Sequence, residues 1–166
     1  MNIVLIGMPG SGKSTVGAML ARRTGRSFIE TDALIEAREG ASIPALFAGR
    51  GESGFRDAEH AAVRAAAAAE HAVIATGGGV ILRPENMEAL SADGAVFFLD
   101  RAPEEIAGEE HGGRPLLAGD RRRVFELYTQ RIALYRKYAS YVIAAGNTPE
   151  ESLERLIETM EREGLL

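Results

Sequence analysis

Short apolar runs alternate along the chain with longer segments in which apolar residues recur at helical spacing. The short runs predict five strands, near residues 2–6, 27–29, 72–75, 95–99 and 141–144. The longer segments predict helices near residues 13–24, 32–39, 52–70, 84–91, 121–138 and 149–163, with a short helical turn near 43–48. Strands that alternate with helices are typical of a parallel sheet covered on both faces, so we expect an α/β fold.

The composition fits one domain of this kind and disfavours several other classes of protein. The chain has 166 residues, 46% of them apolar, and no membrane-length apolar run, which predicts a single soluble domain over residues 1–166. It starts directly with an apolar strand, so we expect no signal peptide and a cytoplasmic location. The absence of cysteine excludes disulfides, thiol catalysis and cysteine-bound zinc. A net charge of −5, with one basic cluster at residues 121–123, disfavours a nucleic-acid partner.

A glycine-rich segment, GMPGSGKST at residues 7–15, follows the first predicted strand and leads into the first helix. Gly7, Gly12, Lys13 and Ser14 fill the pattern G-x-x-x-x-G-K-S/T of a phosphate-binding loop. Glycines let backbone N–H groups close around phosphate oxygens, and the helix presents its positive end to the anion. Lys13 is expected to reach the β- and γ-phosphates, and the Ser14 hydroxyl to bind Mg²⁺. The segment therefore predicts a site for a nucleoside triphosphate.

Charged residues follow the second strand, at the sheet edge where ligands of open α/β folds bind. The stretch Glu30-Thr31-Asp32 offers one carboxylate for a metal-bound water and another for a substrate hydroxyl. Thr31 or Asp32 can instead cap the second helix. Arg56 and Glu59 stand at i, i+3 spacing in a predicted helix, so Glu59 can hold the Arg56 guanidinium in place. The same spacing is also common in surface ion pairs.

Three consecutive glycines, Gly77, Gly78 and Gly79, come directly after the third strand. A run without side chains lets a ligand approach backbone N–H groups, so we expect this run to face a ligand. Arg131, in the long helix near 121–138, is suited to bind a planar anion such as a phosphate or a carboxylate. Taken singly, Arg131 is equally compatible with an exposed helix position.

Residues 108–119, GEEHGGRPLLAG, break the alternation of strands and helices. A loop of this length inside a compact domain is usually functional or disordered. Because it carries Arg114 and four glycines, we expect a lid that closes over the phosphates and excludes water. The expected lid spans approximately residues 108–120.

As a set, these motifs resemble the shikimate kinase family, which belongs to the P-loop kinases related to nucleoside monophosphate kinases. The resemblance runs in order through GMPGSGKST, FIETD with the ALIE that follows, SIPALFAGRGESGFRDAE, TGGGVIL, GGRPLLAG and QRIALY, over nearly the whole chain. It implies a three-layer P-loop fold with a five-stranded parallel sheet in the order 2-3-1-4-5. It also implies a substrate-binding region near residues 32–60 and a monomer.

The resemblance implies a role for individual residues. The ATP-binding residues would be Gly10, Ser11, Gly12, Lys13, Ser14, Thr15, Arg114 and Pro149. The shikimate-binding residues would be Asp32, Arg56, Glu59, Gly77, Gly78, Gly79 and Arg131. Lys13, Asp32 and Arg114 would be catalytic, with Asp32 activating the attacking hydroxyl and Arg114 moving onto the transferring phosphoryl group. Mg²⁺ would be held by Ser14 and, through a water, by Glu30.

The chain departs from the family pattern at three places. Glu30 stands where the family usually has aspartate, so we expect an altered magnesium geometry without loss of the metal. Residues 106–110, IAGEE, lack the basic pair that the family commonly places ahead of the lid, of which one arginine stacks on adenine. We therefore expect a weaker grip on adenine. Ala133 replaces the usual proline before Leu-Tyr, which is a small change within a helix.

The function that these residues favour is ATP-dependent phosphorylation of the shikimate 3-hydroxyl, a step of aromatic amino acid biosynthesis. The nearest alternative is a kinase of the same build for another carboxylate-bearing alcohol such as homoserine, because Arg56 and Arg131 suit either carboxylate. A second alternative is a regulator that binds ATP without catalysis, but it gives Asp32 and the two arginines no role. A nucleoside monophosphate kinase fits less well, given the carboxylate-type pocket and the short lid.

Overall fold

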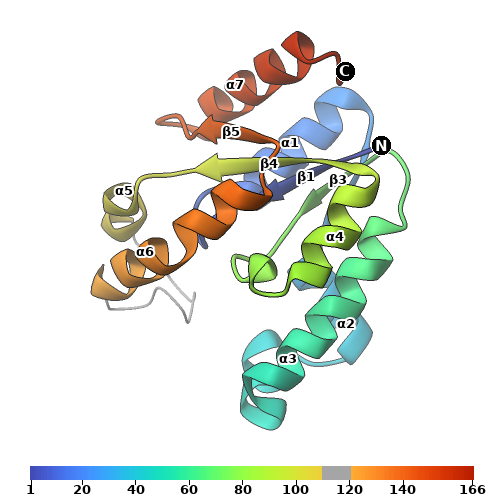
Figure 1. Cartoon of the computed structure of the whole chain (residues 1–166), viewed down its shortest axis with the longest axis vertical. Helices are drawn as coiled ribbons and strands as arrows, with labels where there is room; N and C mark the ends of the chain where they lie inside the picture. Colours follow the sequence, from blue (N-terminus) through green and yellow to red (C-terminus); the bar gives the residue numbers. More distant parts are fainter. Residues whose placement is uncertain (110–120) are drawn as a thin grey trace.

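The computed structural model describes residues 1–109 and 121–166, and in these residues five strands form one parallel sheet (Figure 1). Neighbouring strands pair in the order β2-β3-β1-β4-β5, which confirms the implied topology. The strands are β1 (Asn2–Ile6), β2 (Ser27–Glu30), β3 (Ala72–Ala75), β4 (Gly94–Asp100) and β5 (Tyr141–Ala144). Each end lies within one residue of the end predicted from the apolar runs.

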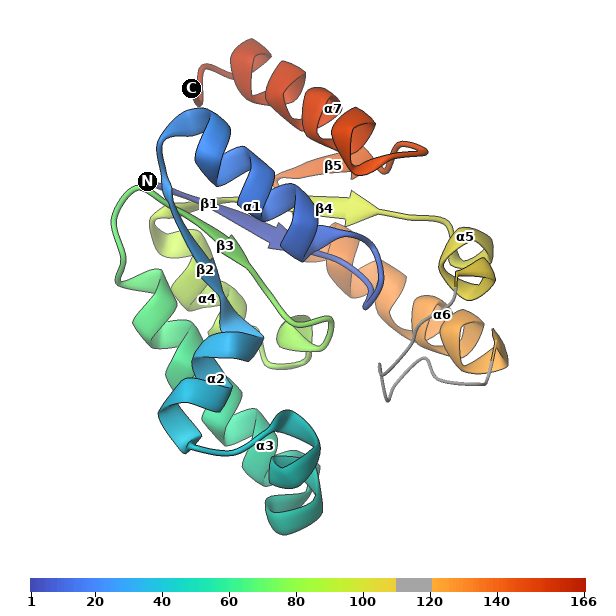
Figure 2. The same ribbon diagram turned by 180° about the vertical axis from the view of Figure 1, so that it is seen from behind.

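Helices cover both faces of this sheet, which gives the three layers of the predicted α/β fold (Figures 1 and 2). On one face lie α1 (Lys13–Thr24) and α7 (Pro149–Arg162). The other face is covered by α4 (Pro84–Ala92), α6 (Arg121–Tyr138) and the later part of α3 (Ile43–Ala67). The remaining helical segments are α2 (Thr31–Glu39), η1 (Val80–Leu82) and α5 (Pro103–Gly108).

The central strand β1 contributes side chains to both layers of the core. Ile3 and Leu5 pack with α1 and α7, whereas Val4 and Ile6 pack with the helices of the opposite face. All four side chains are 0% exposed. Because successive side chains of a strand point to opposite faces, a strand buried on both sides must be apolar at every position. This packing fixes the carboxyl end of β1, from which the phosphate loop starts.

α2 and the first part of α3 extend beyond the edge of the sheet (Figure 2). They share a small apolar cluster that includes Ile35, Leu46 and Phe55, and Phe47 stacks on Phe55 with ring centroids 4.4 Å apart. The pattern predicts a turn of helix near 43–48 and a separate helix over 52–70, and α3 indeed consists of two helical segments separated by a kink. The break between them is at Gly51, where φ is 69° and ψ is −177°, a backbone conformation open to glycine.

The structure also contains two short helical segments that the sequence pattern does not predict, η1 and α5. Both are too short to show a helical period. In addition, α2 begins without the expected side-chain cap, because Glu30 occupies the cap position and makes no capping hydrogen bond. The prediction that Thr31 or Asp32 caps this helix is therefore wrong. Thr31 Oγ1 instead accepts a hydrogen bond from the backbone N–H of Gly77, at 3.1 Å.

Candidate active site

Three of the predicted site segments begin at the carboxyl ends of neighbouring strands. β1 leads into the phosphate loop, β2 into Asp32, and β3 into the run from Gly77 to Gly79. Since these strands are parallel and adjacent in the order β2-β3-β1, the segments that follow them meet at one edge of the sheet. Figure 2 shows the turns after β1 and β3 at this edge.

The phosphate loop has a backbone conformation that its glycines permit. Gly7, Gly10 and Gly12 have φ angles of 150°, 82° and 97°, which residues with a side chain rarely adopt. A methyl group on Gly7 would lie only 2.6 Å from the backbone oxygen of Leu99. The loop is therefore a backbone cradle that a Cβ atom would obstruct, which fits a phosphate-binding role.

The Lys13 ammonium group lies inside this cradle. Lys13 is 7% exposed, and its Nζ donates hydrogen bonds to the carbonyl oxygens of Gly7 and Met8, both at 2.8 Å. It also donates to Ser11 Oγ at 3.3 Å. Because α1 begins at Lys13, the positive end of the helix and the ammonium group act on an anion at the same place. Ser14, the next residue of this helix, is exposed.

Asp32 and Glu59 both lie next to Gly77. A methyl group on Gly77 would be 2.7 Å from Asp32 Oδ1 and 3.4 Å from Glu59 Oε2. Burial raises the pKa of Asp32, and the charge of Lys13 opposes this shift. Burial likewise raises the pKa of Glu59, here against the charge of Arg56. Asp32 is thus a partly desolvated carboxylate with an increased affinity for a proton, as a general base requires.

Arg56 and Glu59 form a buried ion pair. Arg56 Nη1 donates to Glu59 Oε1 at 2.9 Å, and the two side chains are 11% and 1% exposed. Glu52 Oε1 lies a further 3.7 Å from Arg56 Nη2. The alternative of a surface ion pair is therefore wrong. Glu59 holds one edge of the guanidinium of Arg56 and fixes its orientation.

Arg131 is buried on α6, so the alternative of an exposed helix position is also wrong. It is 7% exposed, and its Nη1 is buried without a hydrogen-bond partner among the described residues. The Nε of Arg56 is in the same situation. A buried donor without a partner is unfavourable by about 1–3 kcal/mol, and more for a charged group. These two nitrogens are suited to an anionic ligand, and a third buried nitrogen without a partner among the described residues, the Nε of Arg26, lies elsewhere.

The run of three glycines touches both halves of the site. A methyl group on Gly79 would lie 2.5 Å from Nη1 and Nη2 of Arg56, and one on Gly78 would lie 2.5 Å from Pro9 Cδ in the phosphate loop. Side chains at Gly78 and Gly79 would therefore collide with other residues of the protein, namely Pro9 and Arg56. That a ligand also approaches the run stays a prediction.

Comparison with known proteins identifies the family to which this arrangement belongs. The family model for shikimate kinase matches residues 9–161. The chain belongs to the shikimate kinase family. A shikimate kinase of Symbiobacterium thermophilum is 50% identical over 72% of this chain and 71% of its own length. That of Thermodesulfovibrio yellowstonii is 42% identical over 97% of this chain and 95% of its own.

A solved shikimate kinase has nearly the same fold. The structure of the enzyme from Acinetobacter baumannii in complex with shikimate gives a TM-score of 0.93 at 33% identity. The match covers 99% of this chain and 95% of that chain. The family resemblance and the fold class are therefore confirmed, and the shikimate kinase family comprises ATP-dependent small-molecule kinases.

Tyr135 is a part of this shikimate kinase site that sequence reasoning missed. It lies one helical turn after Arg131, it is 0% exposed, and its hydroxyl donates to the carbonyl oxygen of Gly78 at 2.5 Å. Burial raises the pKa of Tyr135 to about 12, so the hydroxyl stays protonated and remains a donor. Together with Thr31, which accepts from the N–H of Gly77, it fixes the glycine run. The i, i+4 spacing to Arg131 was the available signal.

Of the other predicted site residues, Glu30 lies close enough to Asp32 for its charge, in addition to burial, to raise the pKa of that carboxyl, whereas Arg114 and Pro149 have other outcomes. Arg114 and all but two residues of the expected lid at 108–120 lie outside the described residues. Pro149 is exposed in the first turn of α7, directly after the segment that follows β5. Glu30 is the half-buried last residue of β2. Residues 1–109 and 121–166 contain no cluster of three histidine, aspartate or glutamate side chains that could hold a metal.

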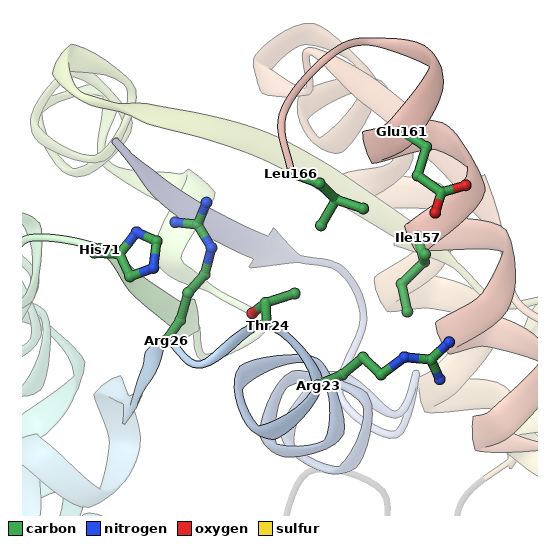
Figure 3. A pocket seen from close by; sticks show the side chains of 7 residues that line it. All are labelled: Arg23, Thr24, Arg26, His71, Ile157, Glu161 and Leu166. Atoms are coloured by element: carbon green, nitrogen blue, oxygen red, sulfur yellow. The ribbon is translucent and has the colours of Figure 1, made fainter.

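A separate pocket of about 310 Å³ lies far from this site (Figure 3). It is lined by residues from the end of α1, the turns that precede β2 and β3, the later part of α7 and the last residue of the chain, among them Arg23, Arg26 and Glu161. Arg26 donates there to the carbonyl oxygens of Met1 at 2.9 Å and Leu165 at 3.4 Å. These contacts tie the two ends of the chain together, so Arg26 has a structural role.

Gly79→Ala is expected to raise the KM for the acceptor by about tenfold or more, with a change in melting temperature of only a few degrees. The new methyl group displaces the guanidinium of Arg56, which is the end of a flexible side chain and can move without unfolding the loop. Gly49→Ala is the matched control, because no atom lies within 4 Å of the added methyl group. Steady-state kinetics and thermal unfolding of both variants test this. An unchanged acceptor KM would show that the position of Arg56 is irrelevant to binding.

Proposed function

We propose that the chain transfers the γ-phosphoryl group of ATP to the 3-hydroxyl of shikimate. The observation that carries this proposal is the pair of buried arginines, Arg56 and Arg131, beside the carboxylate of Asp32. Each arginine has a buried nitrogen without a partner among the described residues. A ring that carries one carboxylate and several hydroxyls supplies an acceptor to the arginines and donors to Asp32. The close similarity to a shikimate-bound enzyme supports the same ligand.

In the acceptor half, Arg56 and Arg131 bind the shikimate carboxylate, and Glu59 positions Arg56. Gly77, Gly78 and Gly79 line the same pocket as the substrate-binding region, which starts near residue 32 and ends near residue 60. Asp32 accepts hydrogen bonds from the ring hydroxyls and takes the proton of the attacking oxygen. Its raised proton affinity, which follows from burial, favours this transfer at neutral pH.

In the donor half, the phosphate loop binds ATP. The residues that we assign to it are Gly10, Ser11, Gly12, Lys13, Ser14 and Thr15, with Pro149 beside the adenine. Lys13 offsets charge that develops on the transferring phosphoryl group, and Arg114 of the lid would act with it. Transfer then needs little covalent chemistry from the protein, since an in-line arrangement of the two substrates is the main requirement.

The residues of the donor half also fit Mg²⁺. Ser14 is exposed at the start of α1. Glu30 is the last residue of β2, at the carboxyl edge of the sheet. Magnesium usually takes one or two protein oxygens and completes its shell with waters and substrate phosphates, so a cluster of carboxylates is not required. Bound there, the ion would neutralise charge on the β- and γ-phosphates. Ser14 would bind it directly and Glu30 through a water.

We also propose that the chain is a single P-loop kinase domain that works as a cytoplasmic monomer. Monomer is the expectation for this family, and the cytoplasm is where ATP is available. Its net charge of −5 supports the absence of a nucleic-acid partner. Among the described helices, none has the length and apolar character needed to cross a membrane.

The test is turnover of the purified protein with ATP and Mg²⁺, in parallel with shikimate and with homoserine. ADP release is coupled to a spectroscopic assay, and mass spectrometry with ³¹P NMR identifies the phosphorylated position. We expect shikimate 3-phosphate, and at least about 100-fold lower kcat/KM with homoserine, which lacks the ring. Efficient turnover of homoserine would support the alternative kinase. Tight ATP binding without product from either alcohol would support the regulator.

A further inference from the structure

Arg101 connects the end of β4 to the phosphate loop, although none of the roles assigned above uses it. It follows directly after the last residue of β4, Asp100. Its Nη1 donates to the carbonyl oxygen of Gly10 at 2.9 Å, across 91 positions of sequence. The side chain of Arg101 is 19% exposed. A largely buried cation therefore holds one backbone carbonyl of the loop that receives the phosphates.

Two carboxylates hold the other edges of the same guanidinium. Nη2 of Arg101 donates to the carboxylate of Glu109, and Nε lies 3.6 Å from Glu105 Oε2. The hydrogen bond to Glu109 is the main reason that the pKa of Arg101 is raised above its ordinary value. A planar fork that donates hydrogen bonds from both Nη1 and Nη2 has less rotational freedom than an unpaired side chain. Arg101 thus presents Nη1 to Gly10 in one orientation.

The hydrogen bond from Arg101 fixes one peptide plane of the phosphate loop. The Gly10 carbonyl accepts from Arg101, and the N–H of the same peptide, that of Ser11, donates to the carbonyl of Met8 at 3.1 Å. In a trans peptide these two groups point in opposite directions, so the plane is held from both sides. Gly10 has a φ of 82° and no side chain that would restrict it. Without Arg101, only one of these two bonds would remain.

We propose that Arg101 is a positioning residue for the nucleotide, which orients the Gly10 peptide while Glu105 and Glu109 anchor its guanidinium. This inference rests on one part of the proposed function, namely that ATP is the phosphoryl donor and binds at the phosphate loop. A loop that is already ordered loses less conformational entropy when phosphates bind. The acceptor groups come from α2, α3, α6 and the loop after β3, so removal of Arg101 weakens nucleotide binding and leaves acceptor binding unchanged.

The test compares Arg101→Ala with the wild-type chain. We expect the dissociation constant of ADP, measured by calorimetry, and the KM for ATP to rise about tenfold, the loss typical of one charge-assisted hydrogen bond. The KM for shikimate stays within twofold. Arg101→Lys keeps a cationic donor and recovers part of the affinity. Arg23→Ala is the control, because Arg23 also makes a 3.3 Å ion pair, with Glu154, away from the loop.

A second experiment separates orientation of the loop from neutralisation of charge. If Arg101 served only to neutralise two carboxylates near the phosphates, ADP affinity would return in the triple variant Arg101→Ala, Glu105→Gln, Glu109→Gln. We expect no return, since the Gly10 carbonyl still lacks its donor. Restored affinity in the triple variant, or normal ADP affinity in Arg101→Ala, overturns the proposal. Should Arg101→Ala not fold by circular dichroism, Arg101→Gln replaces it with the same expected loss, because its amide stops short of Gly10.

These measurements are independent of the acceptor. Calorimetry with ADP needs no turnover, so a chain that fails to phosphorylate shikimate can still show the effect of Arg101. An active wild-type chain with a normal Arg101→Ala variant would leave the proposed function intact and refute the positioning role alone.

Discussion

Asp32→Asn is expected to lower kcat for shikimate by about 10² to 10⁴-fold, the range typical of a lost general base. Asparagine has the same size and still accepts and donates hydrogen bonds, but it cannot take a proton at neutral pH. The affinity for ADP stays the same, since the loop after β1, and not Asp32, binds the phosphates. Single-turnover kinetics, which isolates the chemical step, is the measurement.

The pH dependence of kcat gives a second and independent readout of Asp32. Burial raises its pKa, so the carboxylate is protonated at a higher pH than a free aspartate would be. The wild-type kcat therefore reaches its maximum at a pH above this raised pKa and falls as the pH is lowered through it. Asp32→Asn is expected to lose that acidic limb.

Glu36→Gln provides the matched control for Asp32→Asn. It removes the same charge one turn further along α2, at an exposed position, and the glutamine oxygen can still accept the hydrogen bond from the Ile43 N–H. Because the charge of Glu36 adds to the effect of burial in raising the pKa of Asp32, the comparison is made at neutral pH, where Asp32 is ionised in both chains. We expect its kcat to stay within about twofold, as is usual for a surface substitution away from the reacting atoms. A nearly unchanged kcat in Asp32→Asn would show that another group, or the phosphate itself, accepts the proton.

The strands could be predicted from the sequence because a strand that is buried on both faces is an uninterrupted run of apolar residues. Ile3 to Ile6 are apolar without exception, and both layers of the core require this of a central parallel strand. Lys13 and the glycines before it were equally clear, since a short loop needs each residue type at a fixed spacing. In such segments the residues that determine the local structure are consecutive in the sequence, so the structure can be predicted from them.

The remaining features depend on contacts between distant parts of the chain. Nothing near Arg131 decides whether it is buried, because that follows from how α6 packs on the sheet. The spacing of Arg56 and Glu59 predicts a pair but not its 1% exposed carboxylate. Thr31 has the chemistry of a helix cap and uses it on Gly77 instead. Arg101 lies 91 positions from its partner Gly10, and no local pattern connects the two.

Arg131→Met is expected to raise the KM for shikimate by about 30-fold to several thousand-fold, with a smaller change in kcat. Removing one partner of a buried, hydrogen-bonded charge pair typically reduces binding by about 2–5 kcal/mol, which corresponds to that range. Methionine fills a similar volume without charge, so the substrate carboxylate would face Arg56 alone. Initial rates at varied shikimate concentration and saturating ATP measure this effect.

Thermal unfolding distinguishes lost binding from a damaged fold in this variant. Arg131 has one buried nitrogen without a partner among the described residues, but it also interacts with Tyr135 and with the charge of Glu59, so its replacement by methionine is expected to change the melting temperature by only a few degrees. Arg56→Met is expected to lower the melting temperature, because it leaves the buried carboxylate of Glu59 without its cation. Arg136→Ala, at an exposed position of the same helix, should leave both KM and melting temperature unaltered. A normal KM in Arg131→Met would mean that the carboxylate of the acceptor binds elsewhere.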